Sequence, residues 1–384
     1  MSAALERNET THVQSPEPPH SSRRDPAVLY CFAMMLLPLL AIPAFIGLGR
    51  SNFFLTHGAS FWVRSNDAVF NMKGRHCDVV VFGDSTAMTG VDPEVVDRET
   101  GFHTCNIAVT NAVLAVTGNL TLDRFLAHNE KPKVLVFQLS PDDFQAANRV
   151  WNHTIYAEGL LELLRHGAPR EARQVLITHP HEAANFAGYA AGFTAYYAIR
   201  DAWFHATRMQ PEEDRLRLRA DTTFFTPPAP ARTHCDADAP FSDPTQGAFS
   251  RSLAEDFRSR YANRAAVVLV DVAPIPACDN NLQAYAAQLE GITSNGLRAL
   301  PIAAFNDGRH YTAEGSRMVS AGLALQLNEV ADERPDIDVR RTSPQFIEVG
   351  ASASPRSSSR PALSTEPRID GVGLLSASGL LILP

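Results

Sequence analysis

The residue with the clearest potential for chemistry is Ser85, which follows four large apolar residues and a Gly-Asp pair. Three of the four residues at 79–82 are β-branched, so the run predicts a strand buried on both faces, as in a parallel sheet. Gly83 allows a tight turn. A serine at the start of a following helix has unpaired backbone N–H groups beside it, which stabilise developing negative charge. Because Gly-Asp-Ser is also common in plain turns and N-caps, the motif alone fits both a nucleophile and a structural turn.

A second group of candidate residues lies far along the chain, where Asp307 stands three residues before His310 in a glycine-containing loop. This spacing lets an acid and a base project toward one point. Imidazole titrates near neutrality and can take the proton that makes a serine hydroxyl nucleophilic. The alternative is an Asx turn at Asp307 and an exposed loop histidine. Together with Ser85, the chain supplies nucleophile, acid and base in the order Ser, Asp, His, which predicts a catalytic triad.

The elements that would hold these residues alternate between strand and helix. Strands are predicted at 79–82, 105–109, 134–139 and 266–272, each followed by a helix, including one in the region 111–128. Such alternation is typical of an α/β sandwich built on a parallel sheet. The sequence therefore predicts a sheet whose first strand leads directly to Ser85.

The segment after His310 predicts another helix, at 313–327, with Thr312 as its N-cap. Its apolar residues available for burial are Met318, Ala321, Leu323, Leu325 and Leu327.

Gly83-Asp84-Ser85 matches the first sequence block of the SGNH, or GDSL-type, serine esterases and acyltransferases, and Asp307-x-x-His310 matches the last. The chain resembles this family between residues 77 and 327. The resemblance implies that Ser85 is the nucleophile and His310 the general base, with Asp307 orienting His310 and stabilising its protonated form. It also implies a three-layer α/β/α sandwich with a parallel sheet, SGNH-hydrolase-like and flavodoxin-like. We expect neither a metal nor a cofactor.

Two middle blocks depart from the family pattern. Ala108 stands where the family has a glycine, although its backbone N–H could still donate to an oxyanion. Asp142 stands where a neutral amide normally donates, and an ionised carboxylate would repel an oxyanion. We expect Asp142 to point away and Asn111 to donate instead, a protonated Asp142 being the other alternative. The predicted oxyanion hole is then Ser85, Ala108 and Asn111.

The relaxed third block is similar to that of membrane-anchored relatives, the alginate O-acetylation proteins and the D-alanyl-lipoteichoic acid proteins. This resemblance implies an acyl-ester donor and a carbohydrate acceptor as substrates. It also implies an acyl-exporting membrane protein as a further partner. Fold-level analogy alone carries this expectation.

Residues 27–49 form an uncharged apolar segment long enough to cross a bilayer. It contains Pro38 and Pro43, which membrane helices tolerate better than soluble ones. A cleaved signal peptide is the alternative, but its polar leader would be unusually long. We expect one N-terminal transmembrane helix in the cytoplasmic (inner) membrane, with the N-terminus in the cytoplasm and the catalytic domain outside, in the periplasm or beyond.

The remaining organisation follows from composition. We expect a disordered cytoplasmic tail at 1–26, a catalytic domain at 50–330 and a disordered tail at 331–384. The domain carries an insert at about 148–260, which is predicted to be helical from 156 to 203 and a loop from 224 to 244.

Aromatic residues gather in the helical part of the insert. They fit packing against the main domain, a lid or acceptor groove beside Ser85, or contact with the membrane surface. The cluster comprises Phe186, Tyr189, Phe193, Tyr196, Tyr197, Trp203 and Phe204.

Four cysteines lie in the expected outer domain, where disulfides are possible. Cys235 and Cys278 both occur in loop-like sequence and are the preferred pair, whereas Cys77 and Cys105 border neighbouring strands and are expected to be buried thiols. The dipeptides His76-Cys77 and His234-Cys235 raise a zinc alternative, but no second ligand pair stands at metal-site spacing.

The formal net charge of −8 and the lack of a basic stripe disfavour nucleic-acid binding, and no phosphate-binding glycine loop is present. Two hypotheses remain. The chain is an enzyme that forms an acyl-Ser85 intermediate and passes the acyl group, an acetyl group by the resemblance, to a carbohydrate hydroxyl or to water. Alternatively, it is a catalytically weak envelope scaffold that binds polymer or partner proteins.

Overall fold

The computed structural model describes residues 25–57, 60–144, 153–178, 180–209, 216, 219–235 and 251–337. The two tails predicted to be disordered lie almost wholly outside the described residues, as does the start of the predicted insert.

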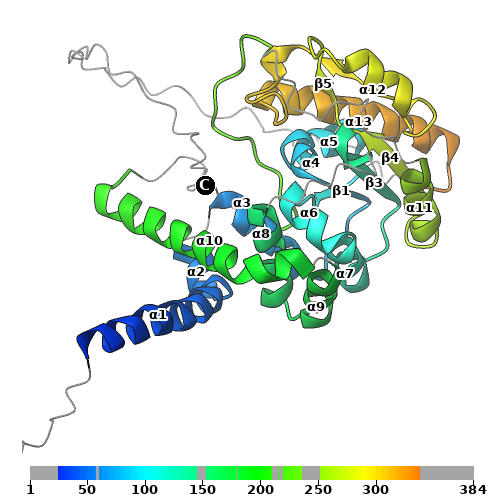
Figure 1. Cartoon of the computed structure of the whole chain (residues 1–384). Coiled ribbons are helices and arrows are strands. Elements are labelled where there is room, and N and C mark those ends of the chain that lie inside the picture. The colour runs from blue at the N-terminus through cyan, green and yellow to red at the C-terminus, as the bar shows by residue number, and fades with distance from the viewer. Residues whose placement is uncertain are drawn as a thin grey trace, which may run out of the picture. The chain divides into compact units, whose positions relative to one another are not determined.

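Figure 1 shows the parallel sheet at the centre of the domain, with strand order β2-β1-β3-β4. Its strands are β1 (Val79–Gly83), β2 (Thr104–Asn106), β3 (Val134–Leu139) and β4 (Val267–Val272). All three pairings are parallel. The predicted α/β class with a parallel sheet is confirmed.

Alternate residues of β1 enter two different hydrophobic cores, because successive side chains of a strand point to opposite faces. Val80 and Phe82 pack with α7 (Leu120–His128), α11 (Arg251–Tyr261) and α12 (Leu282–Leu289). Helices therefore cover one face of the sheet.

The opposite face is covered in the same way. Val79 and Val81 pack with α4 (Ser85–Gly90), α5 (Pro93–Thr100) and α13 (Ala313–Glu333). Burial on both faces explains why β1 is an almost uninterrupted apolar run.

The predicted helix at 111–128 is two helices, α6 (Asn111–Thr117) and α7. They separate at Gly118, whose φ of 53° lies in the left-handed region that glycine adopts without steric cost. A glycine at this position ends the first helix.

The buried face of α13 differs from the prediction. Thr312 is its N-cap, as expected, and its hydroxyl accepts a hydrogen bond from the Gly315 N–H at 3.1 Å. Leu323 and Leu327 are buried, but Leu325 is 68% exposed and Met318 and Ala321 also face solvent. The small residues Ser316 and Ser320 take the buried positions instead, because their hydroxyls donate to the Gly90 carbonyl of α4. The pattern of apolar residues could not show that Ser316 and Ser320 have hydrogen-bond partners in the core.

The insert contains α8 (His153–Arg165), α9 (Pro169–Thr178) and α10 (Pro180–Thr207), in agreement with its predicted helical part. The described part of the predicted loop, residues 224–235, forms neither helix nor strand. Before the sheet, α1 (Pro26–Gly49) is followed by α2 (Asn52–His57) and α3 (Phe61–Asn71).

Short elements complete the described part of the domain. The strands β5 (Ile275–Pro276) and β6 (Ala299–Leu300) form a second small parallel sheet. Two 3₁₀ turns, η1 (Pro141–Phe144) and η3 (Ile302–Ala304), follow β3 and precede the loop of Asp307 and His310.

Two disulfides occur in the structure. The predicted Cys235–Cys278 bond is confirmed. The expectation of buried thiols at Cys77 and Cys105 is wrong, because these cysteines are also bonded, with their Cα atoms 5.7 Å apart. The reason is topological: β2 pairs directly with β1, with Cys105 opposite Val80, and this brings Cys105 close to Cys77, which stands two residues before β1. Since Cys77 and Cys235 are both bonded, neither is available as a zinc thiolate.

Candidate active site

Ser85 lies where β1 passes into α4, and buried Asp84 shapes this turn. The Asp84 Oδ1 accepts hydrogen bonds from the Thr86 N–H at 2.8 Å and the Thr86 hydroxyl at 2.5 Å. Its Oδ2 accepts from the Ser140 N–H of the neighbouring strand end at 3.3 Å. Asp84 is thus the N-cap of α4, and its bonds hold Ser85 at the carboxyl end of β1.

Gly83 is needed because β1 and β3 approach closely here. A Cβ atom at this position would lie 1.8 Å from the Gln138 carbonyl oxygen. No side chain fits at that distance, so glycine is required by the packing before Ser85.

The structure brings Ser85, His310 and Asp307 into one hydrogen-bonded chain. The His310 Nε2 lies 3.0 Å from the Ser85 Oγ, and its Nδ1 lies 2.6 Å from the Asp307 Oδ2. With Asp307 ionised, Nδ1 is the protonated nitrogen and Nε2 is left to accept the Ser85 proton. This is the geometry that nucleophile, base and orienting acid require.

Asp307 is held as a carboxylate by the groups around it. Burial alone would raise its pKa, but the hydrogen bond and charge of His310 act in the opposite direction. The backbone N–H groups of Arg309 and His310 also donate to its Oδ1, at 2.9 and 2.8 Å. The net result is a pKa of about 2, so Asp307 is ionised at neutral pH.

The loop that carries Asp307 and His310 is fixed on both sides. Phe305 and Tyr311 pair in an isolated antiparallel bridge, and the buried Tyr311 hydroxyl donates to the Pro274 carbonyl at 2.7 Å. The Arg232 guanidinium donates to the Asp307 carbonyl at 3.0 Å. These contacts limit the positions open to the imidazole.

Trp62 of α3 lies beside the imidazole of His310, and the centroids of the two rings are 5.1 Å apart. Phe225 packs edge-on against Trp62 at 4.6 Å and against Phe61 at 4.5 Å. Trp62 is itself only partly buried. Sequence reasoning missed this residue, because nothing local marks a helix before β1 as part of the site.

The predicted oxyanion donors have different surroundings. The Ala108 N–H already donates to the Asn106 Oδ1 at 3.0 Å, which conflicts with its expected role. In contrast, no hydrogen bond within the described part of the chain engages the Ser85 N–H or the Asn111 side chain. Asn111 is the first residue of α6 and is partly exposed. The oxyanion role of Ser85 and Asn111 stays a prediction.

Asp142 is turned toward an arginine. Its Oδ2 accepts a hydrogen bond from the Arg309 Nη2 at 2.9 Å, and the two groups form an ion pair. An arginine in this position favours the ionised carboxylate over the protonated alternative, and the role of Asp142 in the site stays a prediction. Sequence reasoning missed Arg309, although it stands between Asp307 and His310.

Comparisons of the chain with protein-family models, curated proteins and solved structures find no match.

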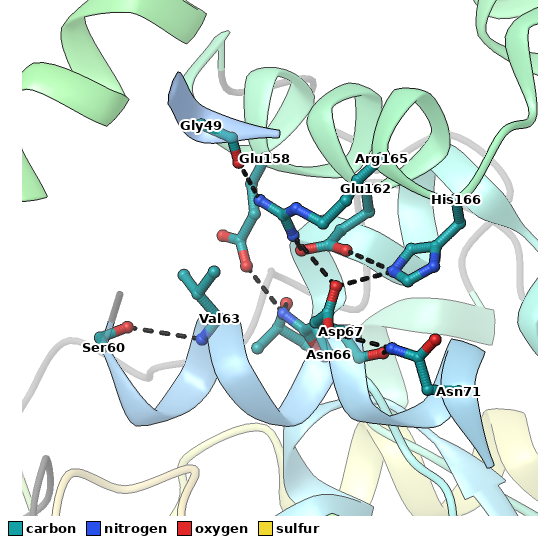
Figure 2. Close-up of polar contacts among 11 residues, drawn as sticks. Gly49, Ser60, Val63, Asn66, Asp67, Asn71, Glu158, Glu162, Arg165 and His166 are labelled. Carbon is teal, nitrogen blue, oxygen red and sulfur yellow. Dashed lines mark hydrogen bonds and ion pairs between the residues drawn. The ribbon is translucent and has the colours of Figure 1, made fainter. Parts of the chain in front are cut away.

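A second polar cluster, shown in Figure 2, has the residue types of a metal site. Asp67, Glu162 and His166 each offer a ligand atom, and these atoms lie within 4.8 Å of one another. However, the Arg165 Nη1 lies 2.5 Å from the Glu162 Oε1 and 3.5 Å from the Asp67 Oδ1. A guanidinium in this position already supplies the positive charge that a metal would bring.

His166 adds to that balance. Its burial would lower its pKa, but hydrogen bonds and charges from Asp67 and Glu162 raise the value above the usual range. The His166 Nε2 lies 2.8 Å from the Asp67 Oδ1. The cluster is better described as an ion-pair network than as a metal centre.

Proposed function

We propose that this chain is a membrane-anchored serine enzyme of the SGNH type that cleaves or transfers an O-acyl ester through an acyl-serine intermediate. The observation that carries the proposal is the hydrogen-bonded chain from Ser85 through His310 to Asp307. The helices on both faces of the parallel sheet support a flavodoxin-like, three-layer SGNH fold.

The proposed reaction proceeds in two steps. The Ser85 Oγ attacks the acyl carbonyl while the His310 Nε2 takes its proton, and collapse of the tetrahedral intermediate expels the donor alkoxide, which receives that proton. An acceptor hydroxyl, or water, then attacks acyl-Ser85 with His310 again as base. Asp307 stabilises the imidazolium in both steps. The Ser85 N–H and the Asn111 amide are the proposed oxyanion donors.

The openness of the site supports a large, hydroxyl-rich acceptor. The side chain of Asp307 is 54% exposed and that of His310 is 20% exposed. Trp62 offers a partly exposed ring next to them, and aromatic faces suit sugar rings. We therefore propose an acetyl or similar ester as donor and an envelope or exported carbohydrate as acceptor. An acyl-exporting membrane protein is the proposed source of the acyl group.

The proposed location is the outer side of the cytoplasmic membrane. Helix α1 is 24 residues long and apolar enough to cross a bilayer. The two disulfides support an oxidising compartment for the domain that follows it.

The second candidate function is a scaffold with little catalytic power. The engaged Ala108 N–H and the Asp142 carboxylate favour it, because both stand where the family pattern places oxyanion donors. Ser85 and His310 in hydrogen-bond contact favour the enzyme.

Labelling with a fluorophosphonate probe separates the two. The full chain in detergent should be labelled at Ser85, and Ser85→Ala should abolish labelling. Ser259→Ala, at an exposed serine of α11, is the matched control and should label like the parent protein. A folded chain that is not labelled would support the scaffold instead.

To separate transfer from hydrolysis, the chain that reacts with the probe would be given an acyl ester with and without oligosaccharide. Acylated sugar formed in excess of free acid would identify a transferase.

A further inference from the structure

Helix α10 packs against the end of α1, the helix that could cross a membrane. A Cβ atom on Gly49 would lie 2.4 Å from the Thr194 Oγ1, so the two helices meet closely at these residues. One turn earlier, Ile46 packs against a small core that includes Ala190 of α10. The Arg165 guanidinium also hydrogen-bonds the Gly49 carbonyl (Figure 2). The last turns of α1 are thus attached to the domain at several points.

Beyond Thr194, α10 presents an exposed stripe of large apolar side chains. Tyr196, Ile199 and Trp203 are 62%, 70% and 64% exposed. Their spacing of three and four residues places them on one face of the helix. Tyr197, by contrast, faces inward and meets the Phe54 ring edge-on at 6.4 Å. The exposed stripe is therefore one defined side of α10, opposite to its packed side.

The length of α1 places this stripe relative to a bilayer. At a rise of about 1.5 Å per residue, its 24 residues extend about 36 Å. The hydrocarbon core is about 30 Å thick, so residues near Gly49 lie close to its outer boundary. Thr194 lies at the same level because it contacts Gly49. Tyr196, Ile199 and Trp203 follow Thr194 within the same helix, α10, which ends at Thr207.

We infer that the face of α10 formed by Tyr196, Ile199 and Trp203 lies in the interfacial layer of the bilayer, beside the anchor. Tyrosine and tryptophan concentrate in this layer because their rings prefer the boundary between lipid and water. The inference rests on the proposed membrane anchor, since it takes the position of the bilayer from α1.

Basic groups near the stripe also favour contact with a lipid bilayer. The Arg200 guanidinium lies over the rings of Tyr197 and Phe204, at 5.5 and 5.0 Å. Exposed Arg50 follows directly after α1. Guanidinium groups at this level would meet the phosphates of lipid headgroups, which a purely apolar protein partner would not provide. The domain would then rest on the membrane through two attachments and keep one orientation.

Tryptophan fluorescence tests the inference in the full chain. Its three tryptophans allow a variant, W62F with W151F, in which Trp203 is the single reporter. The chain is reconstituted in vesicles of phosphatidylcholine and phosphatidylglycerol that carry bromine on acyl carbons near the headgroup. We expect Trp203 to lose most of its fluorescence in these vesicles, compared with unbrominated ones. The matched variant, W151F with W203F, reports from Trp62 and should lose little.

Flotation of the same vesicles separates the possible failures. Protein that floats while Trp203 is quenched no more than Trp62 would overturn the inference and leave the anchor intact; this is also the result expected if the stripe binds another protein. Protein that does not float would contradict the anchor, and the inference would fall with it. Fluorophosphonate labelling, measured in parallel, reports on the serine chemistry independently of both.

Discussion

The Arg309 guanidinium donates to the Asp142 carboxylate across 2.9 Å and thereby joins the loop of the proposed triad to the turn that follows β3. Arg309 stands directly before His310, and its own N–H donates to Asp307. One residue thus touches both the proposed orienting acid and the carboxylate that stands at the position of the amide in the proposed SGNH pattern. In the proposed mechanism, the pair compensates a negative charge that would otherwise oppose the oxyanion.

Arg309→Ala is expected to lower the rate of acylation by about tenfold to a hundredfold, because it leaves the Asp142 carboxylate uncompensated near the reacting carbonyl. The ion pair is partly exposed, so the cost in unfolding free energy should be only about 1 kcal/mol. Rates of fluorophosphonate labelling and urea unfolding measure the two effects.

The double variant Arg309→Ala with Asp142→Asn provides the control. Removing the unpaired negative charge of Asp142 should restore part of the lost acylation rate. If the double variant is as slow as Arg309→Ala, charge compensation is not the role of the pair.

Asp307→Asn is expected to reduce labelling of Ser85 by several orders of magnitude, since an amide neither selects the required imidazole tautomer nor stabilises the imidazolium. The pKa of Asp307 is lowered to about 2, so its carboxylate stabilises the fold above the ordinary pKa of 3.8. That contribution is lost as the pH falls through about 2.

The difference in urea midpoint between the parent protein and Asp307→Asn should therefore be present at pH 6 and shrink toward pH 2. A difference that stays constant over this range would show that the carboxylate charge is not responsible.

Glu158 of α8 gives the opposite pH dependence. Burial, followed by the charge of Glu162, raises its pKa from 4.5 to about 7. A raised acid pKa in the folded state means that stability decreases as the pH rises from about 4.5 to about 7, because the unfolded chain ionises first. Glu158→Gln keeps an acceptor for the Asn66 amide, which donates to Glu158 Oε1 at 2.7 Å.

Glu158→Gln should consequently equal the parent protein at about pH 4 and exceed it at pH 8, as measured by thermal unfolding. An equal gain at both values would indicate that ionisation of Glu158 plays no part.

The Cys77–Cys105 disulfide closes a loop with a sequence separation of 28. Replacing both cysteines by serine is expected to cost about 3–4 kcal/mol of unfolding free energy in the chain-entropy account. Cys105 is fully buried, so reductant should act on this bond only after unfolding. Denaturant titration with and without reductant tests both points, and a cost near zero would contradict them.

Local signals and long-range contacts differ in how far the sequence predicts them. Ser85, Asp307 and His310 belong to short motifs, and strand alternation was sufficient to suggest that the motifs would meet. The contact of Arg309 with Asp142 and the bond of Cys77 to Cys105 depend on which strands pair, which no local pattern contains. The Asn106 side chain bonds the Ala108 N–H two residues on, an Asx turn. That contact is local and was open to prediction.

The position of Trp62 beside His310 leads to the final prediction, which concerns substrate size. If the ring stacks on a sugar, Trp62→Ala should raise the KM for an oligosaccharide acceptor by about tenfold, which corresponds to about 1.4 kcal/mol. Trp62→Phe should lose much less, because it keeps an aromatic face against Phe225. Hydrolysis of a small acyl ester, which does not reach the ring, should change little in both variants, provided that His310 keeps its place. Initial rates with acceptor varied at fixed donor give the KM. An equal loss for the small ester and for the oligosaccharide would mean that Trp62 positions His310 and does not bind substrate.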